Sequence, residues 1–521
     1  MRKRVQVKSR DKQAHGSFFA FRSLIAGRES TVVLMLCLVG ALRVFVFSAA
    51  FPLFDNVDEL QHFDLVLKYS HGSVPHKLPY FGSQASDLIA LYCSPEYSNP
   101  SDFGLSRFPP PIWTFPREAV AKRLTSASHA QQREKNYEAL EPPVYYVVAG
   151  FWWKIGRLLG LGGGPALYWI RFLNVVVYGL LVWLSYAFVR RFYGGLYLRI
   201  GVPFLLAFFP QDILFSINND ILSPLLFLAS LYCLVDICLS DTRPYWFYAL
   251  GGLLVAATMM TKLTNFAILP ALGVTVLLKL RRLLIGGTRP VEVWKTVVLA
   301  SCAAIPLLSW LTWNLVFVGD ATASAEKLQA LGWSVKPFGK MWPHPIFTAG
   351  GAYIFARGLI VGFWRGEFVW YGTTLASPSA DTFYCVSSIL LVTASIVGLF
   401  LHRRKAQTTD RFVRGMCLSV VGLSILPMVL ISVVYDFGNC WHPSRQFPYM
   451  TSGRLIVGVL VPFLCLYLDG VRSALPGARM AFVRVAFVLV AAAVMMGSEV
   501  MLSLGVFGSR FNWFHMVHWP V

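Results

Sequence analysis

Apolar runs long enough to cross a bilayer recur from one end of this chain to the other. The first covers residues 31–53, and runs of similar length follow it almost to the C-terminal end. A transmembrane helix needs about 20 mostly apolar residues to span a hydrocarbon core of about 30 Å. Only 14% of the residues are charged, against about 25% in ordinary globular chains. The sequence therefore predicts an all-α, polytopic membrane protein without a separate soluble domain.

The apolar runs define about 11–12 hydrophobic segments. After 31–53 they lie near 143–160, 168–189, 201–217, 221–239, 246–262, 264–282, 293–316, 381–402, 412–435, 452–471 and 480–504. Two long polar stretches interrupt them, at 54–167 and 319–380. We interpret residues 1–521 as one transmembrane domain, in which 1–30 form a basic tail.

The net charge of +20 is distributed in clusters beside the apolar segments. These clusters are Arg2 to Lys12, Arg190 and Arg191, Lys279 to Arg282, Arg403 to Lys405, and Arg472 to Arg484. Cytoplasmic loops of membrane proteins carry such an excess of Lys and Arg. Every cluster falls inside only if segment 143–160 does not cross, so we predict a re-entrant or interfacial helix there. Eleven crossings then place the N-terminus in the cytoplasm and both long loops and the C-terminus outside. No basic stripe is interleaved with stacking aromatics, so nucleic acid is not an expected partner.

The nine cysteines form no CxxC motif and no Cys/His cluster, so a thiolate metal site is not expected. Cys93 and Cys440 fall in predicted external loops, where a disulfide can persist. A bridge between them and two free thiols both stay open.

An acidic string follows the first apolar run, at Asp55-Asn56-Val57-Asp58-Glu59-Leu60-Gln61-His62. The adjacent carboxylates of Asp58 and Glu59, with His62 nearby, offer a general base or a metal ligand. The alternative is an acidic N-cap for a helix over 58–70, because carboxylates favour that end of a helix.

Three further polar groups lie where apolar segments begin or end. Asp220 closes the turn Asn218-Asn219-Asp220, which is also typical of a plain helix connector. The string Glu141-Pro142-Pro143-Val144-Tyr145-Tyr146 is also typical of an aromatic membrane anchor. Arg454, in Thr451-Ser452-Gly453-Arg454, has the hydrogen-bond donors to bind a phosphate. The alternative is that its side chain only snorkels to the membrane interface.

Two cations lie within apolar segments, where charge costs about 2.5–3.5 kcal/mol on insertion scales. Lys262 lies at a predicted outer helix end, within reach of an external cavity. Arg43 lies in the middle of a segment, so we expect it to pair with an internal polar group.

In order and spacing, these strings resemble the GT-C superfamily of membrane glycosyltransferases, which includes the dolichyl- and undecaprenyl-phosphate-sugar-dependent mannosyl- and aminoarabinose transferases. Within it they are most similar to an uncharacterised bacterial family of GT-C-like membrane proteins. The matching elements are Asp58-Glu59-Leu60-Gln61-His62, Pro142-Pro143-Val144-Tyr145-Tyr146, Arg171-Phe172-Leu173-Asn174, Pro210 with Asn219-Asp220, Thr261-Lys262, Phe363 to Trp370, and Gly453-Arg454. The chain departs from the pattern at Leu455, where the family has Tyr, and at Arg365 inside the aromatic string.

The resemblance implies a GT-C-like helical bundle with an external active site and roles for particular residues. Asp58 would act as base or metal ligand with Glu59 assisting, and Asp220 would be the second carboxylate. A divalent cation (Mg or Mn), if one is used, would lie at Asp58 and Asp220. Arg454 and Lys262, helped by Arg365 or Arg357, would meet the charge on a leaving phosphate. His62, Tyr145 and Trp364 would contact the substrate.

The resulting hypothesis is a glycosyltransferase of the bacterial cytoplasmic membrane. It would move a sugar from a polyprenyl-phosphate-linked donor to a glycan, lipid or protein acceptor on the outer face. The alternatives are a flippase or exporter of lipid-linked saccharides, and a catalytically inactive GT-C-like subunit. A transporter of that kind predicts paired halves with interrupted helices, and no matching halves occur in this sequence.

Overall fold

The computed structural model describes residues 28–94, 96, 109–286, 290–401, 408–438, 440 and 442–515. Within these residues, nine helical stretches are long and apolar enough to cross a membrane, and two shorter apolar helices accompany them. The eleven correspond to α2 (Glu29–Ala50), α7 (Gly163–Phe192), α8 (Leu196–Ala207), α9 (Ser223–Leu239), α10 (Tyr245–Met259), α11 (Ile268–Gly286), α12 (Pro290–Phe317), α16 (Pro378–Leu401), α17 (Thr408–Val434), α18 (Leu460–Ala474) and α19 (Ala481–Phe507). The predicted all-α polytopic fold is confirmed.

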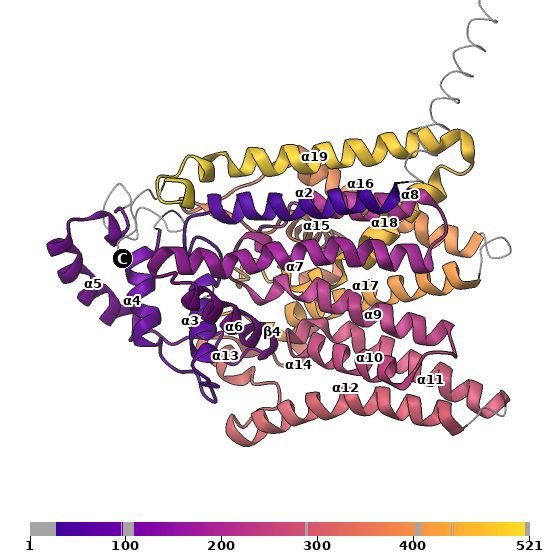
Figure 1. Ribbon diagram of the computed structural model, residues 1–521, viewed down its shortest axis with the longest axis horizontal. Coiled ribbons are helices and arrows are strands. Elements are labelled where there is room, and N and C mark those ends of the chain that lie inside the picture. The colour runs from indigo at the N-terminus through magenta and orange to yellow at the C-terminus, as the bar shows by residue number, and fades with distance from the viewer. Residues whose placement is uncertain are drawn as a thin grey trace, which may run out of the picture.

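These helices run side by side, with α19 and α12 along opposite edges of the bundle (Figure 1). Helices α9 and α18 form its centre, since 78% and 89% of their most apolar windows are buried. The corresponding shares for α12 and α19 are only 17% and 22%. Helices that are apolar all round and lie at the edge expose that surface to lipid, as a membrane bundle requires.

Shorter elements gather at one end of the bundle. They are α3 (Glu59–Ser70), α4 (Ser83–Tyr92), α5 (Arg117–Gln131), α6 (Val144–Leu158), α13 (Ala325–Ala330), α14 (Phe338–Met341) and α15 (Ala349–Arg365), with strands β1 (Ser334–Val335), β2 (Val369–Trp370), β3 (Thr373–Thr374) and β4 (Tyr435–Asp436). Strand β1 pairs with β4 and β2 with β3, both antiparallel. The β1–β4 pair ties the second long stretch to the link between α17 and α18.

The two long polar stretches share one end of the bundle with the C-terminal end of α19, while the C-terminal ends of α7, α11, α16 and α18 lie at the other (Figure 1). The described basic clusters at 190–191, 279–282 and 472–484 lie at that second end. Residues 1–27 of the basic tail and the cluster at 403–405 lie outside the described residues. The described basic clusters and the two long polar stretches thus lie at opposite ends of the bundle, as the charge pattern predicts. Which end faces the cytoplasm stays a prediction.

Segment 143–160 forms α6, which packs against α3 and against α7 at the loop end (Figure 1). The segment predicted over 201–217 is wrong in extent, because α8 ends at Ala207. Pro210 has no amide hydrogen to donate, and it pushes Phe209 out of the helical region. The chain then forms only the short 3-10 helix η4 (Asp212–Phe215) under the site described next.

Arg43 has the internal partner that the sequence predicts. Its guanidinium donates to both carboxylate oxygens of Glu499, over 2.8 and 2.5 Å, and to the carbonyl of Phe209 over 2.5 Å. A buried charge needs such pairing. The pair joins α2 to α19.

Candidate functional site

Asp58 occupies the N-cap position of α3, but its side chain does not cap the helix. Its backbone is left-handed, with φ of 62°, which turns the carboxylate away from the first turn. One carboxylate oxygen accepts from the Tyr137 hydroxyl over 2.7 Å, and the other from Arg454 over 2.5 Å. The capping alternative therefore does not describe this residue.

Arg454 bridges the two predicted carboxylates. Besides its bond to Asp58, its Nη1 lies 3.7 Å from Oδ2 of Asp220. It is the second residue of the 3-10 helix η8 (Gly453–Val459), and its side chain, 13% exposed, contacts these acids rather than snorkelling to the interface. Gly453 makes this position possible, because a Cβ there would lie 1.9 Å from the amide nitrogen of Phe363. The Gly-Arg pair thus lets η8 approach the end of α15 closely and presents the guanidinium to both acids.

Lys262 completes a charged row that consists of Asp58, Arg454, Asp220 and Lys262. Its Nζ contacts Oδ1 of Asp220, which is fully buried. The turn itself is capped by Asn218, whose side chain accepts from the Asp220 amide over 2.8 Å. Asp220 is therefore not needed as a cap, and its second oxygen, Oδ2, has no hydrogen-bond partner among the described residues.

His62 lies behind Asp58 on α3 and shares a 2.7 Å hydrogen bond with the Tyr146 hydroxyl. Burial and the charges of Lys262 and Arg454 lower the pKa of His62 to about 3, although Asp58 opposes them. The imidazole is therefore neutral at pH 7. Burial on its own would raise the pKa of Asp58, but the charge of Arg454 and the hydrogen bonds from Arg454 and Tyr137 hold that pKa well below its usual range. Asp58 is an ionised carboxylate.

A second ionic cluster joins the two long stretches beside the row. Lys327 on α13 donates to Glu138 over 2.6 Å and to Glu141 over 3.0 Å. Burial raises the pKa of Glu138 above its usual range even though Lys327 opposes the shift. Burial has the same tendency at Glu141, but Lys327 and Lys262 lower the pKa of that carboxyl below its usual range. Asn219 links this cluster to the charged row by donating to Glu141 over 3.3 Å.

Glu59 does not join the charged row, which revises the assisting role expected for it. Both its oxygens accept from Arg171, over 2.7 and 2.6 Å, and both side chains are fully buried. Oε1 also accepts from the amide of Ile217 over 2.9 Å. Arg171 donates further to the carbonyls of Phe51 and Pro52. Glu59 is a partner within the framework that holds the end of α2 against α7.

The Arg171-Phe172-Leu173-Asn174 element has the same framework role at both its ends. Asn174 donates to the carbonyls of Leu214 and Ser216, over 3.1 and 2.8 Å. Arg171 thus fixes the chain just before Asp58, and Asn174 fixes the chain just before Asp220. A single helix, α7, positions both candidate carboxylates.

The two rings expected to contact substrate are both buried. The ring of Tyr145 is 1% exposed and packs edge-on against Tyr146. Trp364 is fully buried, stacks against Phe209 and Tyr384, and donates to Ser388 over 2.9 Å. Neither ring faces an open site, because aromatic area of this size is used to pack the bundle.

The two cations expected from the second long stretch are also placed elsewhere. Arg365 donates to both oxygens of Asp381, over 2.7 and 3.1 Å, and to the carbonyl of Leu375. Arg357 is exposed on α15. Arg365 therefore joins α15 to α16, and the charge opposite the candidate carboxylates comes from Arg454 and Lys262.

Glu367, in the same aromatic string, lies next to the charged row. It accepts from the hydroxyl of Ser452 over 3.1 Å, and its amide donates to Asp212 over 3.1 Å. Gly366 has φ of +80°, and a Cβ there would lie 1.8 Å from Oδ1 of Asp212. Burial and then Glu367 raise the pKa of Asp212 to about 7, with Arg454 and Arg365 opposing. This second acidic pair was not predicted from the sequence.

The Mg²⁺ or Mn²⁺ ion that the resemblance leaves open at Asp58 and Asp220 does not fit these residues as they are placed. Arg454 and Lys262 already lie against Asp58 and Asp220, where they would repel a divalent cation. Within the part of the chain that the structure describes, no group of three or more His, Cys, Asp and Glu side chains is arranged to hold a metal. The charges that neutralise the two carboxylates are side-chain cations.

A cavity of about 600 Å³ opens beside the ionic cluster, between the ends of α3, α6 and α12. Glu141 lies on its wall, and most of the other lining groups are apolar, including Tyr69, Val147 and Trp313. Val147 and Trp313 are 55% and 42% exposed. The cavity thus provides an apolar route from the outer surface of the bundle to Glu141. Asn219 connects Glu141 to the charged row, because it donates to Glu141 and directly precedes Asp220.

Cys93 and Cys440 are free thiols. The thiol of Cys93 is directed to the Ser94 carbonyl, and the sulfur of Cys440 contacts the Leu331 carbonyl and the Trp333 indole. The disulfide alternative is wrong in this structure.

Tyr137, Glu138 and Lys327 were missed by the sequence argument. Tyr137 and Glu138 precede the Glu141-Pro142-Pro143 string by a few residues, and that proximity was the available signal. Lys327 lies in a polar stretch with no pattern of its own. Only the folding of the second long stretch onto the first brings Lys327 to the site.

No protein-family model and no curated protein matches the chain. Among solved structures, the chain is similar to the apo form of the Archaeoglobus fulgidus oligosaccharyltransferase, at 12% identity and a TM-score of 0.41 over 91% of this chain and 56% of that one. It is also similar to the oligosaccharyltransferase AglB of Archaeoglobus fulgidus in complex with an inhibitory peptide and a dolichol-phosphate, at 11% identity and a TM-score of 0.39 over 90% and 56%. The chain spans about half the length of these structures. Similarities of this size assign no activity to it.

Proposed function

We propose that this protein is a membrane glycosyltransferase that moves a sugar from a polyprenyl-phosphate-linked donor to an acceptor at the outer face of the membrane. The acceptor would be a glycan, a lipid or a protein of the cell envelope. The observation that carries the proposal is the charged row, in which two carboxylates alternate with two cations. Each of its four residues also belongs to one of the strings on which the resemblance to GT-C glycosyltransferases rests.

The cations of the row suit a leaving phosphate. When the bond between the sugar C1 and the phosphate oxygen breaks, negative charge develops on that oxygen, and preorganised donors stabilise it best. Arg454 and Lys262 are fixed by Asp220 on both sides. An arginine is suited to a phosphate because its fork of donors matches two oxygens.

Asp58 suits the role of base only after its partner changes. In the resting arrangement Arg454 holds the pKa of Asp58 well below its usual range, and a carboxylate so stabilised is a weak base. A phosphate that binds Arg454 competes for the same guanidinium. Asp58 would then recover basicity when the donor arrives and accept the proton of the acceptor hydroxyl or amide as its oxygen or nitrogen attacks C1.

The cavity beside Glu141 suits the lipid part of the donor. It is lined mainly by apolar residues and opens where α6 and α12 expose Val147 and Trp313. A polyprenyl chain can reach such an opening from the bilayer without crossing water. The phosphate end would then lie towards the charged row.

The decisive experiment uses a strain that lacks the protein and is complemented with single variants. Asp58→Asn removes the charge but keeps the shape, and Asn tolerates a left-handed backbone better than most residues do. We expect a drop in transfer of roughly a hundred- to ten-thousand-fold, the usual range for a lost general base. Asp220→Asn should also impair transfer strongly. Mass spectrometry of envelope glycans and lipid-linked sugars gives the measure, as a missing sugar with an accumulated carrier.

Asp241→Asn is the matched control, because that carboxylate is exposed and pairs with Lys279 and Arg282 at the opposite end of the bundle. Its transfer should equal that of the wild type. Near-normal transfer by Asp58→Asn at equal membrane abundance would contradict the assignment of Asp58 as the catalytic base. Accumulation of the unchanged glycan on the inner side would instead favour an exporter. No difference between the deleted and complemented strains would favour an inactive subunit.

A further inference from the structure

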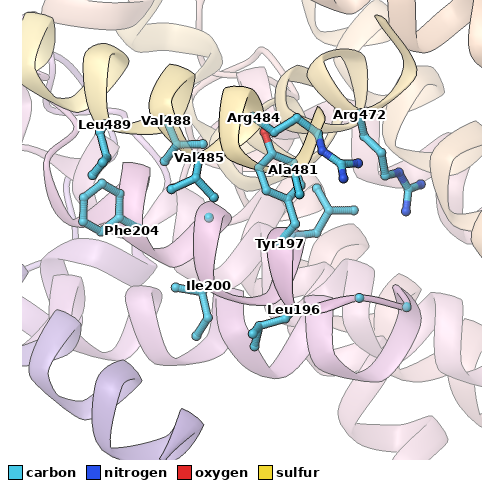
Figure 2. Close-up of a pocket in the computed structure, with 14 residues that line it drawn as sticks. Leu196, Tyr197, Ile200, Phe204, Arg472, Ala481, Arg484, Val485, Val488 and Leu489 are labelled. Carbon is cyan, nitrogen blue, oxygen red and sulfur yellow. The ribbon is translucent and has the colours of Figure 1, made fainter. Parts of the chain in front are cut away.

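A second cavity, of about 560 Å³, lies between α8 and α19, far from the charged row. Apolar side chains from both helices line its length, and Arg484, Arg472 and Tyr197 lie towards one end (Figure 2). That end adjoins the turn between α18 and α19, at the end of the bundle that carries the basic clusters. Its volume lies within the roughly 300–1,000 Å³ of ordinary ligand sites.

The two arginines at this end differ in their partners. Arg472 is balanced by acids, because it contacts Asp469 over 2.6 Å and Asp410 over 3.1 Å. Arg484 has no carboxylate partner among the described residues. Its Nη2 donates to the Gly477 carbonyl over 3.2 Å, and its guanidinium lies 5.6 Å from the centre of the Tyr197 ring.

Two polar atoms at this end are buried and lack partners. They are Nε of Arg484 and the hydroxyl oxygen of Tyr197, and neither has a hydrogen-bond partner among the described residues. A buried donor left unpaired destabilises the folded protein, and does so more when it is charged. Two such donors next to one uncompensated positive charge indicate an anion with acceptor oxygens.

The rest of the cavity is suited to hydrocarbon. Its walls are formed by Ile200 and Phe204 on α8 and by Val485, Val488 and Leu489 on α19. Leu489 is 55% exposed on the outer surface of the bundle. From Tyr197 to Phe204 the groove follows seven residues of helix, a distance of roughly 10 Å at 1.5 Å per residue. Such a groove accommodates part of an acyl chain.

We propose that this groove binds one anionic phospholipid, with its phosphate at Arg484 and Tyr197 and an acyl chain along α8 and α19. A lipid supplies both parts that the groove requires, an anion at the interface and a chain in the apolar region. Basic residues beside a membrane helix attract anionic headgroups in this way. The site is independent of the proposed transfer reaction and lies at the other end of the bundle.

Native mass spectrometry of the detergent-solubilised protein tests this site with phosphatidylglycerol and phosphatidylcholine of identical chains. The wild type should retain one phosphatidylglycerol, more tightly than phosphatidylcholine. Arg484→Gln should weaken that binding about tenfold or more, since a hydrogen bond to a charged group is worth about 1.5–3 kcal/mol. Tyr197→Phe should weaken it less.

Arg479→Gln is the matched control, because it removes the same charge from the turn just before α19 and Arg479 does not line the cavity. Its binding should equal that of the wild type. Ala481→Phe adds volume inside the groove and should lower the binding of both lipids while Arg484 stays in place. Equal retention by Arg484→Gln and the wild type, or equal binding of the two lipids, would overturn the proposal, as would a dimer that forms in place of the lipid adduct. Size-exclusion profiles matching the wild type show that each variant is folded.

Discussion

At the scale of single residues, the adjacent acids Asp58 and Glu59 have opposite environments. Asp58 belongs to the charged row and its side chain is about 12% exposed, whereas the side chain of Glu59 is fully buried against Arg171. Neighbouring side chains on a helix point in different directions. One position of offset along α3 is enough to place one carboxylate in a candidate site and the other in the framework.

Glu59→Gln should therefore destabilise the protein rather than act as a mild catalytic control. Removing one partner of a buried ion pair costs about 3–5 kcal/mol, because the other charge is left uncompensated. We expect a lower melting temperature in detergent and lower membrane abundance than for Glu118→Gln, an exposed Glu on α5. Arg171→Gln should have a similar effect. If Glu59→Gln melts like the wild type, the pair does not stabilise the fold as proposed.

His62 should make stability depend on pH. In the folded chain its pKa is lowered from 6.5 to about 3, so below pH 6.5 the unfolded chain binds a proton that the folded chain does not. Stability should therefore fall as the pH drops from 6.5 towards 3, by at most roughly 1.4 kcal/mol per pH unit for this one group.

The measurement compares melting temperatures at pH 7 and pH 5 for the wild type and His62→Gln. Gln cannot titrate, so the variant should lose less stability than the wild type over this interval. The comparison isolates His62 from Glu138, whose raised pKa acts in the opposite direction because its folded form binds the extra proton. Equal losses in the two proteins would refute a neutral, buried His62.

At the scale of elements, α13 connects the second long stretch to the first through Lys327. This short helix has no buried residue of its own, so its position depends on polar contacts. These are the contacts of Lys327 with Glu138 and Glu141, and the hydrogen bond that Glu326 accepts from the Leu78 amide over 2.8 Å. Lys327→Gln should release α13 and leave two carboxylates together. We expect faster hydrogen exchange across α13 and a partial loss of transfer.

Lys340→Gln on α14 is the matched control, because that lysine is exposed in the same stretch. Its exchange and transfer should equal those of the wild type. Unchanged exchange across α13 in Lys327→Gln would show that other contacts hold this helix.

At the scale of the whole molecule, the prediction is the side on which each end of the bundle lies. Single cysteines at Ser73 and Arg510 should react with an impermeant thiol reagent in cells stripped of any outer barrier, and a cysteine at Asp241 should not. All three positions are exposed, so a lack of labelling reports the side and not burial. Ser509 is unsuitable, because it is buried and donates to Glu96 over 2.6 Å. Labelling at Asp241 with protection at Ser73 would reverse the orientation.

Much of the fold could be predicted from the sequence because lipid imposes a local rule. Each spanning helix must be apolar over its own length, and each basic cluster follows its own segment. The number of helices, and the end of the bundle at which each basic cluster lies, can therefore be predicted without knowing which helices are neighbours. The error at 201–217 arose where Pro210 ended the helix within an apolar run that was long enough to span, whereas Pro203 lies inside α8. Arg43 also followed a local rule, since charge in lipid requires a partner.

The candidate site was only partly predictable, because its parts come from stretches far apart in the chain. The sequence alone singled out Asp58, Asp220, Lys262 and Arg454, each of which breaks an apolar or capping pattern at a helix end. It did not distinguish Asp58 from Glu59. Nor did it distinguish Lys262 and Arg454, which contact the candidate carboxylates, from Arg365, which pairs elsewhere. Those distinctions depend on which partner each side chain meets, such as Asp381 for Arg365 and Arg171 for Glu59. Polarity is a property of the residue, whereas pairing and burial are decided by the tertiary structure.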